Sequence, residues 1–199
     1  MNSAIATTRT ELMNAFDRLF DVFAIREDVL YYQPLNGGWS IYRVFEHVVL
    51  ANHFLLRIVN KQAEKTMQWA NRAGNKNKVQ PYVLDTGKLK SMELNGSYIW
   101  VPQRYTEPVG DTPLLELKIS LHDQLKQAIE LLENEKLLKA IEDSYVAGKI
   151  DALHYLYFLA QHMQRHLGQV SRLKKEFNHR QRKSLYNETV RLAKTICLN

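Results

Sequence analysis

The chain contains very little cysteine and no long hydrophobic run. Its only cysteine, Cys197, lies two residues from the end of the 199-residue sequence, so an intrachain disulfide and a cysteine-rich metal site are both excluded. No apolar run approaches the ~20 residues that span a bilayer, and the N-terminal stretch lacks a basic leader followed by an apolar core. We therefore expect a cytoplasmic protein with no membrane partner.

Repeats and low-complexity tracts are also absent. The composition, 45% hydrophobic and 24% charged, is ordinary for one globular domain of this length. The net charge of +6 is not spread over the chain: the segment from Arg172 to Lys194 holds eight Lys or Arg and two Glu, so the rest is neutral. This distribution argues against nucleic acid as a partner.

The same C-terminal segment has apolar residues at helical spacing, namely Leu185, Tyr186, Val190, Ala193 and Ile196. This pattern predicts an amphipathic helix that docks on the rest of the protein and leaves its basic face in water.

The most informative stretch runs from Asp151 to Arg172. Its apolar residues recur at intervals of three and four, which predicts a helix with one buried face: Leu153, Leu156, Ala160, Met163, Leu167 and Val170. His162 and His166 lie one turn apart on one side, about 40° from each other around the axis, so both rings can reach one metal ion. Seven histidines in the chain can also produce such a pair by chance, as surface or core residues.

Three further helices are predicted from apolar periodicity. The first ends near Ile25, and a turn over residues 31–38 follows, which contains Pro34 and two glycines. Ser40 is a suitable N-cap for the second helix. The third helix has Asp111 or Thr112 as a cap and Pro113 at its first position.

The connection between the second and third helices is long. Residues 71–112 show no sustained period, and a short hairpin over residues 90–101 is possible there. A connection of this length is unusual unless it covers a site, so we expect a lid or pocket wall. After the third helix, a short helical piece is expected to reach Tyr145, and Gly148 separates it from the fourth.

Four long amphipathic helices predict a helix bundle, in which metal sites are built from inward-facing side chains. Two histidines are too few for a catalytic metal site, which generally uses three protein ligands. His47, on the flank of the second helix's apolar stripe, is the best candidate for the third, with His53 as its competitor.

The sequence resembles the DinB superfamily of four-helix-bundle proteins. The residues that carry the resemblance are Trp39-Ser40 followed by His47, and, far downstream, His162, His166 and Gly168-Gln169. That superfamily includes bacillithiol-transferase-like members and members once assigned as metal-dependent hydrolases. The resemblance covers the chain to about Phe177. It implies an all-α, up-down-down-up bundle as a single domain over residues 1–199, with a core over residues 1–177 and an extra basic helix over residues 178–199.

The resemblance also implies a divalent metal ion, nickel or zinc, held by His47, His162 and His166, a small-molecule substrate and a homodimer. An open position on such a metal can activate water or a small thiol. Glu46 points about 100° away from His47 around the helix, so no general base accompanies the histidines. We therefore favour transfer of a low-molecular-weight thiol to an electrophile, with a hydrolase or a non-catalytic, stress-related metal module as alternatives.

Several residues are expected around the metal. Gln169, one turn beyond His166, is suited to hold a ligand ring or substrate, and Gly168 suggests close approach of another helix. Arg43 and Trp39 are expected to face the open side of the metal and to favour a small, partly apolar anion. The alternative is that Arg43 pairs with an acid on the surface and that the aromatic residues of the connection form a small core of their own. The predicted walls of that pocket are Tyr82, Tyr98, Trp100 and Tyr105.

Overall fold

The computed structural model describes residues 3–73, 105–134, 141–144 and 148–196. Four long helices dominate them: α1 (Ser3–Phe20), α3 (Ile41–Ala73), α5 (Leu114–Glu133) and α7 (Ala152–Ile196). A 3-10 turn η1 (Asp21–Ala24) and the short helix α2 (Glu27–Leu30) follow α1. The predicted all-α bundle is confirmed.

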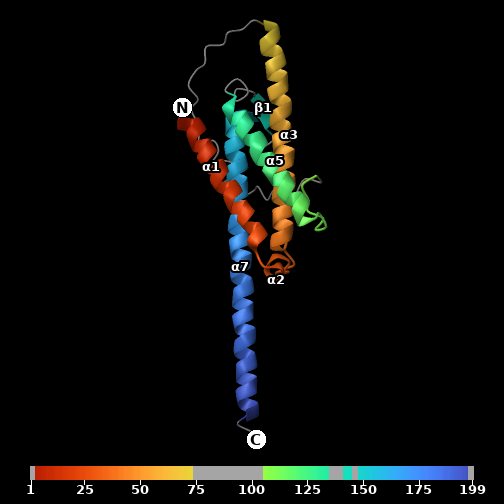
Figure 1. Cartoon of the computed structure of the whole chain (residues 1–199), viewed down its shortest axis with the longest axis vertical. Helices are drawn as coiled ribbons and strands as arrows, with labels where there is room; N and C mark the ends of the chain where they lie inside the picture. Colours follow the sequence, from red (N-terminus) through yellow and green to blue (C-terminus); the bar gives the residue numbers. More distant parts are fainter. Residues whose placement is uncertain (1–2, 74–104, 135–140, 145–147, 197–199) are drawn as a thin grey trace.

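The helices run in the up-down-down-up order. Figure 1 shows α1 and α7 pointing one way along the long axis and α3 and α5 pointing the other way. Helix α1 packs on α7 and α5, and α3 also packs on α7 and α5. Because α3 and α5 are parallel, the end of α3 and the start of α5 lie far apart along the bundle, which accounts for a long connection.

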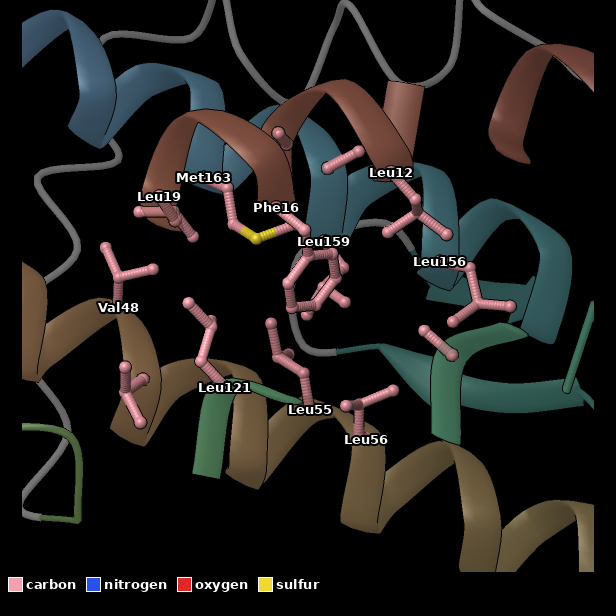
Figure 2. Close-up of a cluster of buried hydrophobic side chains, with 14 of the residues drawn as sticks. Leu12, Phe16, Leu19, Val48, Leu55, Leu56, Leu121, Leu156, Leu159 and Met163 are labelled. Atoms are coloured by element: carbon pink, nitrogen blue, oxygen red, sulfur yellow. The ribbon is translucent and has the colours of Figure 1, made fainter. Parts of the chain in front are cut away.

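The core lies where these four helices meet. Figure 2 shows Phe16 of α1 at its centre, with Leu121 of α5 and Met163 of α7 beside it. The largest fully buried side chains come from all four helices: Leu12, Phe16, Leu19, Ile41, Phe45, Leu56, Leu121, Leu153, Leu156, Leu159 and Met163. Three of them, Leu153, Leu156 and Met163, belong to the apolar face predicted for α7, and burial of such faces accounts for the assembly of the bundle.

The segment before α7 differs from the prediction. Residues expected to end a short helix form strand β1 (Ile141–Ser144), which pairs antiparallel with β2 (Gly148–Asp151) in the register Ile141↔Asp151. The prediction of helix up to Tyr145 is therefore wrong over residues 141–144. Asp and Ser favour local hydrogen bonds that compete with a helix, and a short connection suits a hairpin.

The C-terminal segment is helical, as predicted, but it does not form a separate helix. Helix α7 continues without a break for 45 residues, because no Gly or Pro follows Gly168. Among the side chains of α7 that the structure describes, which end at residue 191, Phe177 is the last buried one, and residues 178–189 are all exposed. The predicted docking is therefore wrong: Leu185 and Tyr186 are 62% and 70% exposed, and Figure 1 shows α7 projecting beyond the bundle.

Two turns determine how α3 enters the bundle. Asn36 accepts a hydrogen bond from the backbone N–H of Gly38, and Gly37 has a φ of +72°, which favours glycine. Ser40 then accepts a hydrogen bond from the backbone N–H of Arg43 at 3.3 Å, so its predicted role as N-cap is confirmed. None of the described helices combines the length and the hydropathy that crossing a membrane requires.

Candidate metal centre

Three histidines from two antiparallel helices meet near the start of α3. His47 comes from the second turn of α3, and His162 and His166 come from successive turns of α7. One ring nitrogen from each lies within 4.8 Å of the other two. The ring centroid of His47 lies 5.6 Å from that of His162 and 4.8 Å from that of His166. The predicted convergence is confirmed, and these three side chains could form a metal site.

The spacing of the nitrogens fits a metal ion. The Nε2 atoms of His162 and His166 are 3.1 Å apart. Two imidazole nitrogens at the usual Zn–N distance of ~2.0–2.1 Å in tetrahedral geometry would be about 3.3 Å apart. The α7 pair therefore needs only a small adjustment to share one ion.

Hydrogen bonds at the opposite ring nitrogens fix which nitrogen faces the centre. The Nδ1–H of His47 donates to the backbone carbonyl of Thr106 at 2.6 Å, since that oxygen can only accept. The Nδ1 of His166 lies 3.2 Å from Oε1 of Gln169, to which it donates. Both rings thus present an Nε2 lone pair inward, and Gln169 lies beside the His166 ring; its role toward a metal ligand stays a prediction.

Burial keeps the three rings neutral. His47 and His162 are buried, and His166 is half-buried. Burial lowers the pKa of His47, although the Thr106 carbonyl partly opposes this effect. Burial, and then the neighbouring His47, lower the pKa of His166 to about 4. Burial, followed by repulsion from His166 and His47, lowers the pKa of His162 well below its usual value. All three nitrogens can therefore accept a metal at neutral pH.

Two aromatic rings border the histidines. The half-buried Trp39 ring packs on His47, with the two ring centroids 5.0 Å apart. Phe158, one turn before His162 on α7, lies 6.4 Å from that ring. Phe158 was not among the predicted residues, although its four-residue spacing from His162 was a usable signal. These rings restrict water around the centre.

A short segment of the long connection crosses the start of α3, and we call residues 106–112 the strap. Four side chains on α3 hold it. Arg43 donates to the carbonyl of Pro108 at 3.0 Å, and Glu46 accepts from the N–H of Gly110 at 2.6 Å. Glu46 also accepts from the hydroxyl of Thr112 at 2.6 Å. The carbonyls of Thr106 and Thr112 accept from His47 and from the Tyr42 hydroxyl, respectively.

The strap changes the interpretation of several predicted residues. Glu46 points away from the centre, as expected, because its carboxylate binds the strap. Thr112 donates to Glu46, and α5 begins at Leu114 with Pro113 as its N-cap residue, so the predicted cap is wrong. Arg43 contacts strap carbonyls, and its contact with an anionic ligand stays a prediction.

Other candidates lie elsewhere. His53 is exposed, so it is not the third histidine of the cluster. Tyr105 is 75% exposed, so its predicted place in a pocket wall is wrong. Tyr82, Tyr98 and Trp100 lie outside the described residues, as does the predicted hairpin over residues 90–101.

Gly168 does not mark a close helix contact, contrary to the prediction. A Cβ at this position would meet only the Arg172 side chain, at 3.7 Å. Gly168→Ala is therefore expected to stabilise the protein by about 1 kcal/mol, because alanine is the better helix former, and to raise the Tm by about 2–4 °C. Thermal unfolding followed by circular dichroism measures this. Gly37→Ala, at a positive φ, should lower the Tm, and a lower Tm for Gly168→Ala would contradict the prediction.

An up-down-down-up bundle with three inward histidines on its second and fourth long helices defines the class of protein. The chain belongs to the DinB superfamily, because the model of that superfamily matches residues 4–170. The match includes His47, His162, His166 and Gln169. No curated protein and no solved structure matches the chain in the two other comparisons.

Proposed function

We propose that His47, His162 and His166 bind one divalent metal ion, nickel or zinc, and that the protein uses it to transfer a low-molecular-weight thiol to an electrophilic small molecule. Three neutral imidazoles suit these borderline metals and leave a coordination position open. When bound, the metal would act as a Lewis acid that favours the thiolate form of a thiol at that position.

The observation that supports the choice of thiol transfer is that the described residues place no carboxylate among the three histidines as a general base. Among the residues that the structure describes, the potential ligands clustered here are three histidines and no carboxylate. The adjacent carboxylate, Glu46, accepts two hydrogen bonds from the strap. Hydrolysis benefits from a base that accepts a proton from water, whereas a thiol has a much lower pKa and needs less help.

The proposed reaction balances without a further reagent. The thiol sulfur forms a bond to the electrophilic carbon, the bond to the leaving group breaks with its electron pair, and the thiol proton passes to solvent. The chain's own residues hold the metal, orient the ligand rings through Thr106 and Gln169, and restrict water through Trp39 and Phe158.

A thiol titration tests this proposal. The cobalt-substituted protein, titrated with cysteine-based thiols, is expected to develop a sulfur-to-cobalt charge-transfer band that saturates by millimolar thiol. Arg43→Ala should weaken binding of carboxylate-bearing thiols if its guanidinium assists them. The control is Arg57→Ala, an exposed arginine further along the same helix. An unchanged spectrum at millimolar thiol would overturn thiol transfer and favour a hydrolase or a non-catalytic metal module.

A further inference from the structure

Glu46 is a buried carboxylate that the metal cluster does not use. Its side chain is only 1% exposed, and among the side chains that the structure describes it is the only buried carboxylate. Burying a charged carboxylate is unfavourable unless hydrogen bonds replace its water. Glu46 therefore requires an explanation other than surface charge.

Both hydrogen bonds to Glu46 come from the strap. Oε2 accepts from the backbone N–H of Gly110 and Oε1 accepts from the hydroxyl of Thr112, each at 2.6 Å. Hydrogen bonds to an ionised acceptor are about twice as strong as neutral ones. Gly110 has a φ of +91°, a backbone conformation that favours glycine. One end of the strap is thus clamped to α3.

The other end of the strap contacts a predicted metal ligand. The carbonyl of Thr106, which is 6% exposed, accepts the Nδ1–H of His47 at 2.6 Å. Glu46 and His47 are adjacent in sequence but point to different sides of α3. The strap therefore connects them: Glu46 anchors residues 110 and 112, and residue 106 orients the His47 ring.

We propose that Glu46 is a positioning residue of the metal centre, which acts through the strap to fix the Nδ1–H tautomer and the ring orientation of His47. The consequence for metal affinity rests on the proposed metal binding, whereas the consequence for the tautomer does not. Hydrogen-bond partners of ligand histidines typically change metal affinity 10- to 100-fold when removed. Glu46 is one step further out, and its effect depends on how firmly it holds the strap.

The test compares four variants in two measurements. Glu46→Ala removes the clamp, Glu46→Gln keeps an acceptor for Gly110 and can donate to the Thr112 hydroxyl, and Thr112→Val removes one donor while the carboxylate remains. Gln124→Ala is the matched control. Gln124 of α5 is 2% exposed and donates to the carbonyl of Val49, which lies on α3 like Glu46 but away from the strap.

The first measurement is the tautomer of His47 in the metal-free protein, from nitrogen-15 NMR of the imidazole rings. We expect the Nδ1–H form in the wild type and in Gln124→Ala, and a substantial Nε2–H population in Glu46→Ala. Glu46→Gln should restore the wild-type form. If Glu46→Ala does not fold, Thr112→Val should show the same shift to a smaller extent.

The second measurement is the zinc dissociation constant from competition with a chelator. We expect it to rise about 10-fold or more in Glu46→Ala, and only a few-fold in Glu46→Gln and Gln124→Ala. The positioning role would be overturned if Glu46→Ala kept the wild-type tautomer of His47 and the wild-type zinc affinity. It would also be overturned if Gln124→Ala lost as much zinc affinity as Glu46→Ala. A wild type that binds neither zinc nor nickel would overturn the proposed function, and the tautomer would still decide the role of Glu46.

Discussion

Replacing His162 with alanine is expected to remove metal binding from the protein. His162 is 8% exposed, and its Nε2 lies 3.1 Å from that of His166, so alanine at this position removes one of the three clustered ring nitrogens and puts no other side-chain nitrogen in its place. The loss in affinity should exceed the 10- to 100-fold that is typical for losing an outer hydrogen-bond partner of a ligand. The proposed metal would then be held by two histidines alone.

Metal analysis of untagged protein measures this effect, together with competition against a chelator. We expect about one ion per chain in the wild type and almost none in His162→Ala. His53→Ala is the control, because it removes an exposed histidine from α3 and leaves the cluster intact. Equal metal content in wild type and His162→Ala would exclude His162 as a ligand.

Acid should destabilise the metal-free protein through the same histidines. An unfolded histidine has a pKa near 6.5, whereas the folded pKa of His166 is about 4 and those of His47 and His162 are also lowered. Between these values the unfolded chain binds more protons than the folded one, so the free energy of unfolding falls as the pH falls. The loss begins near pH 6.5 and is complete for His166 near pH 4.

The expected loss in the free energy of unfolding is on the order of 3 kcal/mol for His166, because each pKa unit corresponds to about 1.4 kcal/mol. The partial exposure of its ring reduces this value. Urea unfolding at several pH values in the presence of chelator measures it. His166→Gln should flatten the pH dependence, and His53→Gln should leave it unchanged. An identical pH dependence in wild type and His166→Gln would contradict the lowered pKa.

The helices and the pair His162 and His166 could be predicted because both depend on spacing within one helix. Apolar residues three and four apart define the buried faces of α1, α3, α5 and α7. His162 and His166 follow the same rule, since residues one turn apart must share a side. Choosing His47 over His53 required the family pattern as well, because both lie on α3 and only packing separates them.

The strap could not be predicted because its contacts join distant residues through the backbone. The carbonyl of Thr106 is chemically the same as any other carbonyl, so the sequence carries no sign that it binds His47 59 residues away. Glu46 was expected to point away from the centre, but its partners, Gly110 and Thr112, lie in a stretch without periodicity. Such contacts depend on the path of the connection, which local patterns do not determine.

The end of α7 shows another limit of spacing arguments. Leu185 and Tyr186 have the spacing of a docking face. Figure 1 shows, however, that α1, α3 and α5 do not extend alongside the C-terminal part of α7. An amphipathic pattern indicates which side of a helix would be buried, not whether a partner is present. Gly168 is similar, because a glycine within a helix does not show what lies beside it.

The length of α7 affects how the molecule moves through solution. A helix of 45 residues is about 67 Å long, whereas a compact domain of 199 residues has a radius of gyration of about 16 Å. The projecting part increases friction with little added mass. A monomer therefore elutes early from a gel-filtration column, as a larger compact protein would. It also sediments slowly, as a smaller compact protein would. The expected homodimer has to be tested by light scattering or native mass, in which shape does not imitate a second subunit.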